Sequence, residues 1–302
     1  MKSASFLSLG WVLVKWGFAL GIGGFLFTFL LLLKNTQLPR YPSFTPESPS
    51  LPLEEVAFQT ADGLRLRGSF SLRDSRRPTI LLCHGVGANR SDLYPFAQVL
   101  YEKGRMNVFS FDFRAHGESE GRFTSYGAIE QRDLEAALAF LDQRALRRDY
   151  GCMGISMGGS VGILVASQDT RVKALWVDSP YVDLAETIET HLKLLYPLPS
   201  FPFIPFTLLS YRLLFHTPAH EISPIRVVER IAPRPLMIVN GASDERMRPE
   251  DAQRLYDRAK EPRSLWLIPD AGHLEGHALN AGDYEERLVA FFEKAFPEKG
   301  VP

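Results

Sequence analysis

The chain has 302 residues, of which 45% are hydrophobic and 23% charged, and its formal net charge at pH 7 is −1. This composition is typical of a globular protein with a large core, and the near-zero charge gives no support for nucleic acid as a partner. The two cysteines, Cys83 and Cys152, are too few for a disulfide framework. No His, Cys or carboxylate spacing suits a metal site, so we expect neither a metal nor a cofactor.

The N-terminal segment is predicted to cross a membrane. Residues 16–33 form an uncharged apolar run, and its 18 residues are about enough to span the hydrocarbon core. No small-residue cleavage site follows, so we expect residues 1–36 to be an uncleaved, single-pass anchor. The α-amino group, Lys2 and Lys15 precede the span, whereas Lys34 and Arg40 follow it, and this balance slightly favours a catalytic domain outside the cytoplasm.

Residues 37–52 are predicted to be a stiff linker, because prolines recur through them between Ser and Thr residues. We expect one domain over residues 53–302. It opens with a predicted β-hairpin over residues 55–72, since the Asp62-Gly63 pair separates two runs of alternating apolar and polar residues.

Strand and helix patterns then alternate along the chain. The predicted strands cover residues 79–83, 108–111, 150–155, 172–177, 235–240 and 264–268, and the predicted helices cover residues 93–101, 126–147, 157–166, 249–260 and 283–295. This order predicts an α/β domain with a mostly parallel central sheet and helices on both faces. Cys83 and Cys152 fall in two of these strands; we expect buried thiols, and a bridge between neighbouring strands is the alternative.

The alternation breaks at residues 185–216, where large apolar residues are dense and prolines recur. The prolines should prevent a regular helix through the middle, and the segment is too apolar for a solvated loop. We therefore predict an inserted lid over the catalytic edge of the sheet, within residues 185–222. Its candidate substrate contacts are Phe201, Phe203 and Phe206. The alternative is a pair of helices packed on the core.

The segment Gly154-Ile155-Ser156-Met157-Gly158 matches the G-x-S-x-G nucleophile elbow. The chemistry requires this spacing, because a serine on a sharp strand-to-helix turn presents its hydroxyl at the sheet edge. The turn is strained, so the flanking residues must lack bulky side chains. Alone, the pattern is only moderately specific, and the alternative is an ordinary glycine-rich turn.

Three residues carry the proposed chemistry. Ser156, Asp244 and His273 each follow a predicted strand, where catalytic groups of open parallel sheets gather. A serine hydroxyl is a weak nucleophile and needs an adjacent base, for which His273 is the candidate. Asp244 would orient the imidazole and stabilise its protonated form. The backbone N–H of Met157, the residue after the nucleophile, would be one donor to the oxyanion.

Other residues compete for these roles. His277 is the alternative base if the loop is offset, and Asp178 is the reserve acid because it also follows a strand. Asp270 is too close to His273 in sequence for a comfortable pairing, and we expect Asp112 to brace its own loop.

On these motifs, residues 55–297 resemble the α/β-hydrolase superfamily, in its serine-hydrolase branch of monoacylglycerol-lipase-like and aminopeptidase-like enzymes. The matching motifs are His84-Gly85, the segment 112–119, the elbow, Gly241-x-x-Asp244 and Ala271-Gly272-His273. The resemblance implies an α/β-hydrolase fold and a backbone N–H of Val86 as the second oxyanion donor. It also implies that His84 and His116 belong to structural loops.

The sequence therefore predicts a membrane-anchored serine hydrolase that cleaves carboxylic esters, with an apolar acyl group, through an acyl-enzyme. Its expected partners are a small-molecule or lipid ester and the membrane. An amidase or peptidase with the same triad is one alternative, and a non-catalytic hydrolase-like lipid-binding protein is another. Ser156 at the elbow argues against a dehalogenase or an epoxide hydrolase, and no G-x-G-x-x-G follows Gly85 to support a dinucleotide site.

Overall fold

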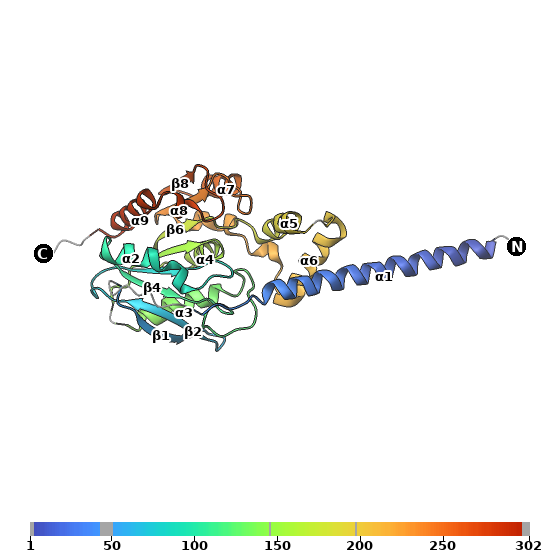
Figure 1. Cartoon of the computed structure of the whole chain (residues 1–302), viewed down its shortest axis with the longest axis horizontal. Helices are drawn as coiled ribbons and strands as arrows, with labels where there is room; N and C mark the ends of the chain where they lie inside the picture. The colour runs from blue at the N-terminus through green and yellow to red at the C-terminus, as the bar shows by residue number, and fades with distance from the viewer. Residues whose placement is uncertain (1–2, 43–50, 145, 197, 298–302) are drawn as a thin grey trace.

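A computed structural model describes residues 3–42, 51–144, 146–196 and 198–297. Figure 1 shows a long N-terminal helix, α1 (Ser3–Thr36), that leaves an α/β body and runs past a helical lid. Within the described residues, one stretch of α1, Lys15–Thr36, is long and apolar enough to cross a membrane, whether as an anchor or as a signal sequence. Most of the predicted linker, residues 43–50, lies outside the described residues.

The body is built on an eight-stranded sheet in the order β1-β2-β4-β3-β5-β6-β7-β8. The first two strands form the predicted hairpin and pair antiparallel, as do β2 and β4, whereas the remaining neighbours are parallel. The strands are β1 (Glu54–Gln59), β2 (Arg65–Ser71), β3 (Thr79–Cys83), β4 (Asn107–Phe111), β5 (Tyr150–Ile155), β6 (Val172–Asp178), β7 (Leu236–Gly241) and β8 (Arg263–Ile268). The mostly parallel sheet predicted from the sequence is confirmed.

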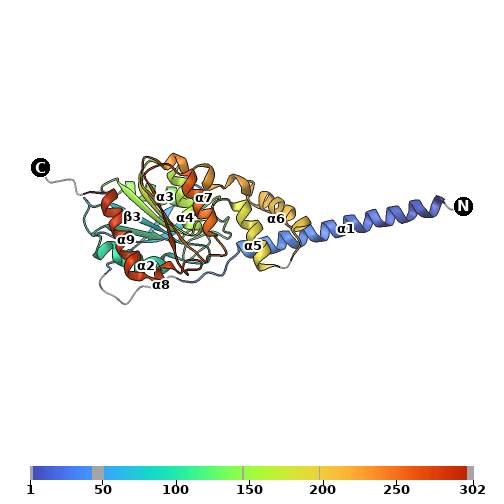
Figure 2. The ribbon, with the colours of Figure 1, turned by 90° about the horizontal axis from the view of Figure 1, so that it is seen from above.

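Helices cover both faces of the sheet, as Figure 2 shows. Helices α3 (Gln131–Asp142), α4 (Met157–Ala166) and α7 (Pro249–Arg258) contribute to the core on one face, and α2 (Tyr94–Glu102) and α9 (Ala281–Ala295) to the core on the other. In β3, Leu81 and Cys83 pack into the first core, and Ile80 and Leu82 into the second. This two-sided burial explains why the strand reads as a continuous apolar run. The short helix α8 (Gly276–Leu279) precedes α9.

Cys83 and Cys152 lie on the neighbouring strands β3 and β5, with their Sγ atoms 3.8 Å apart. Both are free thiols and both are buried. The expected buried thiols are therefore present, and the alternative bridge is not formed.

The helix predicted over residues 126–147 is too long at both ends, because α3 covers only Gln131–Asp142. Tyr126 and Gly127 both have positive φ, which a helix does not allow. The buried carboxylate of Glu130 accepts hydrogen bonds from the backbone N–H groups of Ser125 and Gly127, at 2.8 Å each. The segment is thus a loop held by one carboxylate, and α3 begins after it.

The lid consists of two helices, α5 (Leu184–Leu195) and α6 (Ser200–Phe215). As predicted, no regular helix runs through the middle of the segment, because helical structure is interrupted between Leu195 and Phe201, although α6 does contain Pro205. Phe201 has non-helical backbone angles, so regular helix begins after it. Pro205 then falls in the first turn, where proline is tolerated better than in a helix interior.

A buried arginine holds together the loops that border the sheet edge. Arg90, whose side chain is 4% exposed, forms ion pairs with the fully buried Asp112, with Glu118 at 2.5 Å and with Glu55 at 2.7 Å. Its Nε also donates to Ser69 Oγ at 2.9 Å. This cluster joins the segment after β3, the loop after β4 and the hairpin, so Asp112 does brace its loop.

Replacing Arg90 with Met should lower the free energy of unfolding by about 3–5 kcal/mol, because it leaves a buried carboxylate without its cation. The control is Arg76→Met. Arg76 pairs with Asp74 at the surface, where its side chain is 85% exposed, so its loss should change the free energy of unfolding far less. Urea unfolding of both variants measures the difference. Equal losses would show that the buried cluster contributes no more than a surface pair.

Candidate active site

Ser156 lies on a sharp turn between β5 and α4, with φ of 49° and ψ of −120°. The turn brings backbone segments so close together that only glycine fits on either side. A Cβ atom at Gly154 would lie 2.4 Å from the carbonyl oxygen of Gly158, and one at Gly158 would lie 2.1 Å from that of Cys83. The two glycines of the motif therefore allow α4 to start directly against the end of β3, with Ser156 at the sheet edge.

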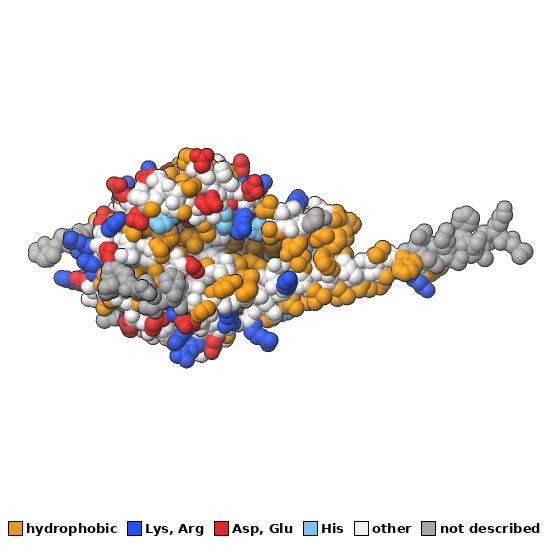
Figure 3. Space-filling view, in the orientation of Figure 1, with side chains coloured by type: hydrophobic (Ala, Val, Ile, Leu, Met, Phe, Trp, Pro, Cys, Tyr) orange, Lys and Arg blue, Asp and Glu red, His pale blue; other side chains and the backbone are white. Residues whose placement is uncertain are grey.

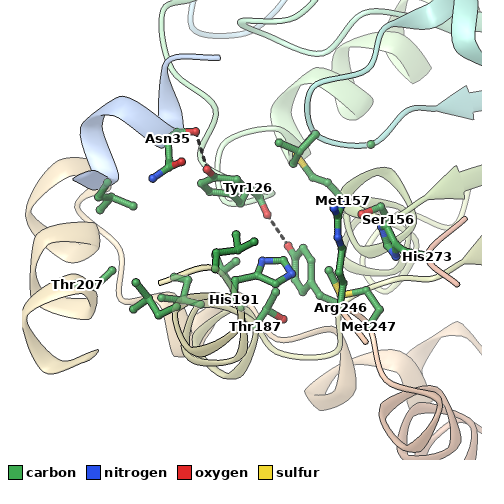
Figure 4. A pocket seen from close by; sticks show the side chains of 18 of the residues that line it. Asn35, Tyr126, Ser156, Met157, Thr187, His191, Thr207, Arg246, Met247 and His273 are labelled. Carbon is green, nitrogen blue, oxygen red and sulfur yellow. Dashed lines mark hydrogen bonds between the residues drawn. The ribbon is translucent and has the colours of Figure 1, made fainter. Parts of the chain in front are cut away.

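Asp244 and His273 follow β7 and β8 and meet at the same edge. Nδ1 of His273 lies 2.8 Å from Oδ2 of Asp244. The other carboxylate oxygen, Oδ1, accepts backbone N–H groups of Arg246 and Met247, each at 2.9 Å. The buried carboxylate is thereby fixed, and when Nδ1 donates to it, Nε2 is the basic nitrogen of the imidazole. Figure 4 shows Ser156 and His273 side by side at one end of a pocket.

The pocket is a cavity of about 360 Å³, within the range of small-molecule sites. Ser156 and His273 both line it. Its other lining residues come from three parts of the chain: the α/β body, the lid and the N-terminal helix. The lid and α1 contribute most of the apolar wall, with Leu31, Leu32, Leu184, Ile188, Leu192 and Leu195.

Sequence reasoning missed the contribution of α1, because an isolated anchor was expected there. Thr28, Leu31, Leu32 and Asn35 line the cavity, and their spacing is that of one helix face. Thr28 is fully buried although it interrupts an apolar run. A polar residue at this spacing in a predicted span was the available signal.

His191 on α5 also lines the cavity, and its buried Nε2 has no hydrogen-bond partner among the described residues. Burial lowers the pKa of His191 below its usual value, which favours the neutral imidazole. The i, i+3, i+4 and i+7 spacing of Leu184, Thr187, Ile188 and His191 could have placed it on the cavity face.

The two backbone positions expected to bind an oxyanion also border the cavity. Met157 is the first residue of α4, where N–H groups have no intrahelical acceptor. Val86 follows β3, and both residues line the cavity with Ser156. The Cβ of Ser156 lies 3.3 Å from where a Cβ would stand at Gly85, so the segment after β3 passes close to Ser156.

The competing residues are engaged elsewhere. Asp178 accepts Tyr284 Oη at 2.7 Å and Ser179 Oγ at 2.9 Å, and burial raises its pKa. His277 faces Glu285 at 3.3 Å and packs on Phe96, away from the cavity lining.

The two histidines of the expected structural loops are buried. Nε2 of His84 accepts the backbone N–H of Phe113 at 3.0 Å, and Nδ1 of His116 lies 2.8 Å from the carbonyl oxygen of Arg114. Burial lowers the pKa of both imidazoles. Each ring therefore stays neutral and bonds to loop backbone.

The candidate substrate contacts in the lid require correction. Phe203 and Phe206 pack edge-on against Phe27 and Phe25 of α1, with ring centroids 6.2 and 5.9 Å apart. Phe201 is 80% exposed. None of the three lid residues is among those that line the cavity. Two of these side chains pack between α6 and α1 and the third is exposed at the surface, whereas residues of α5 and α1 form most of the apolar cavity wall.

Comparisons with known proteins agree with the fold. A model of the alpha/beta hydrolase family matches residues 80–290. The chain is 27% identical over 246 residues to YqkD of Bacillus subtilis, covering 80% of each chain. It is also 27% identical over 277 residues to the α/β-hydrolase domain-containing protein WAV2 of Arabidopsis thaliana, covering 86% of this chain and 84% of the relative.

Among solved structures, the chain is similar to the esterase Pf2001 of Pyrococcus furiosus. The TM-score is 0.71 at 27% identity, and the match covers 85% of this chain and 98% of the esterase. The predicted α/β-hydrolase fold is thereby confirmed. The resemblance to a particular branch of the superfamily stays a prediction.

The close contact at the elbow leads to a prediction on stability. Gly158→Ala should lower the free energy of unfolding by about 1–3 kcal/mol or more, because the new methyl group meets the backbone of β3. The control is Gly162→Ala in the same helix, where a Cβ would meet only side chains of Leu175 and Cys152, at 3.2 and 3.4 Å. Thermal unfolding compares the two variants. Similar midpoints would contradict the required close approach.

Proposed function

Because the chain belongs to the α/β-hydrolase family and is a hydrolase, we propose that it is a serine hydrolase that cleaves carboxylic esters through an acyl-enzyme. The observation that carries the proposal is the cavity shared by Ser156 and His273, with His273 bonded to the buried Asp244 at 2.8 Å. These residues have the types and the chain order that such a mechanism needs, and His273 has the carboxylate partner that would orient it.

In the first half of the reaction, Ser156 Oγ bonds to the ester carbonyl carbon while Nε2 of His273 takes the hydroxyl proton. The carbonyl π electrons move to oxygen and form the oxyanion. Asp244 stabilises the imidazolium and keeps its orientation. When the tetrahedral intermediate collapses, the carbon–oxygen bond to the alcohol breaks and the alcohol leaves with the proton from His273. Ser156 then carries the acyl group as an ester.

In the second half, His273 takes a proton from water, and the resulting nucleophile attacks the acyl carbon. Collapse breaks the bond to Ser156 Oγ, which regains a proton from His273, and the carboxylic acid leaves. The backbone N–H groups of Met157 and Val86 would stabilise both oxyanions. One such donor typically contributes about 3–4 kcal/mol to lowering the barrier.

The shape of the cavity supports an apolar acyl group. The wall away from Ser156 consists mainly of leucine and isoleucine side chains from α1 and α5, with no carboxylate among the lining residues. Burying a hydrocarbon chain there is favourable by about 0.8 kcal/mol per methylene. We further propose that α1 anchors the protein in a membrane, because its stretch Lys15–Thr36 is long and apolar enough to span one, and because α1 packs on the lid and joins the cavity wall.

Ser156→Ala should abolish labelling by a serine-directed fluorophosphonate and lower ester hydrolysis at least about 10³-fold, because the nucleophile is lost. The measurement uses the full-length protein in detergent with a series of chromogenic acyl esters. Ser160, which follows on α4 with its hydroxyl bonded to the carbonyl of Tyr181, supplies the control Ser160→Ala, which should still be labelled. Unchanged hydrolysis by Ser156→Ala would refute the mechanism. Labelling without ester hydrolysis would favour an amide substrate.

His273→Gln should lower hydrolysis by about 10³-fold or more while leaving the fold intact, because the general base is lost. The matched control is His277→Gln, four residues further on, which should keep activity close to that of the unmodified protein. Steady-state rates on the best ester of the series decide between them. If His277→Gln lost activity and His273→Gln kept it, the assignment of the general base would be reversed.

A further inference from the structure

We propose that the cavity takes its substrate directly from a lipid bilayer: the lid is immersed in one leaflet, and the acyl chain of a membrane lipid ester lies along α1. The proposal rests on the proposed function for the hydrolytic step and adds the substrate class and its route. It makes the cavity face of α1 a specificity-determining surface rather than part of a tether.

The C-terminal end of α1 is fixed to the body. Tyr126 Oη donates to the carbonyl oxygen of Asn35 at 2.6 Å, and the backbone N–H of Thr124 donates to that of Thr36 at 2.9 Å. Beyond the helix, Arg40 donates to the carbonyl oxygen of Ser119 at 2.9 Å. These bonds join the end of α1, and the segment that follows it, to the loops of the body between residues 119 and 126. We infer that α1 keeps a set position relative to Ser156.

The same helix is fixed to the lid. Asn35 Nδ2 donates to Tyr196 Oη at 3.3 Å, and the Phe206 ring lies 3.4 Å from where a Cβ would stand at Gly24. The two edge-on aromatic pairs between α6 and α1 lie within one helical turn of Gly24. The absence of a side chain at Gly24 lets the α6 ring approach the α1 backbone. Contact between the lid and α1 therefore extends from Asn35 to Gly24.

These contacts set the depth of the lid if α1 spans a membrane. The uncharged run ends at Leu33, and Gly24 lies about 14 Å further along the helix at 1.5 Å per residue. The hydrocarbon core is about 30 Å thick, so Phe206 would lie close to its middle. A span that ended before Gly24 would keep the lid in water, but it would place the charged Lys15 near the centre of the bilayer, which is unfavourable.

The lid has the surface that such a position requires. Residues 194–196 and 198–209, here called the lid tip, contain no charged side chain. Its exposed side chains include Leu194, Leu195, Phe201 and Leu209. In Figure 3 the hydrophobic colour of the lid continues onto the adjoining stretch of α1 without a polar boundary. An apolar surface that continues into a membrane span fits the same lipid leaflet.

The cavity is open at this surface. Leu195 both lines the cavity and is 59% exposed, so the apolar end of the cavity reaches the lid tip. At the other end, the exposed Arg246 lines the cavity and stands between His191 and His273 in Figure 4. An ester that enters from the leaflet thus keeps its acyl chain against α1 and α5, while its polar head faces water beside Arg246.

The first test narrows the acyl end of the cavity from α1. Leu31→Trp adds bulk to a lining residue, and Leu30→Trp adds the same bulk to the neighbouring residue, which is 61% exposed and faces away. Full-length variants in phosphatidylcholine vesicles are given 4-nitrophenyl palmitate or 4-nitrophenyl acetate. Leu31→Trp should lower kcat/KM on palmitate at least about tenfold more than on acetate, since an overfilled apolar pocket excludes the longer group more strongly. Leu30→Trp should resemble the unmodified protein on both esters.

The second test measures whether the lid lies in the bilayer, and its readout does not depend on catalysis. Phe201→Cys, labelled with an environment-sensitive fluorophore, should show a blue-shifted emission in vesicles and quenching by lipids that carry a nitroxide on the acyl chain. The control is Leu72→Cys, at an exposed site on the body beyond β2, which should stay unquenched. Cys83 and Cys152 are buried and should not react.

Two results would overturn the proposal: equal effects of Leu31→Trp on both esters, or a label at Phe201 that remains in water. Should Leu31→Trp fail to fold, the label at Phe201 still decides. Failure of the proposed function is a separate outcome, namely no Ser156-dependent hydrolysis of either ester and no fluorophosphonate labelling. The label at Phe201 would report on the membrane position of the lid in that case too.

Discussion

The backbone contact between the start of α4 and the end of β3 is the constraint on which the site depends. It exists because Gly154 and Gly158 carry no side chains at a point where a Cβ would lie within 2.4 Å of a carbonyl oxygen. The contact turns the chain sharply, gives Ser156 its positive φ and brings the first N–H of α4 beside the segment after β3. The proposed nucleophile and both proposed oxyanion donors are therefore positioned by one packing arrangement at the end of the fully buried strand β3.

The histidine is positioned by a different means. Asp244 is held by two backbone N–H groups of its own loop and presents its second oxygen to His273, so the imidazole orientation follows from the loop after β7. Asp178, on the adjacent strand, is just as buried, but Tyr284 and Ser179 occupy its oxygens. Both carboxylates lie at one sheet edge, but different groups bond to their oxygens. Only Asp244 is therefore bonded to the imidazole of His273.

The sequence predicted what depends on local patterns. Buried apolar runs marked the parallel strands, and strand-end positions identified Ser156, Asp244 and His273 as the residues to bring together. It failed where distant contacts decide the outcome. The loop around Glu130 interrupts a pattern that reads as helix, and Pro205 is tolerated because α6 starts just before it. The phenylalanines of the lid were assigned to the cavity because the pattern gave no sign that α1 would pack on them.

The docking of α1 also bears on how this enzyme is prepared for study. Removing a predicted anchor is the usual route to a water-soluble protein, and a chain shortened to begin at Gln37 would retain Ser156, Asp244 and His273. It would lose Thr28, Leu31, Leu32 and Asn35 from the cavity, together with the surface that covers Phe203 and Phe206. Kinetic constants from such a truncated protein would describe a wider cavity with a newly exposed aromatic edge, and its substrate profile would differ from that of the intact chain.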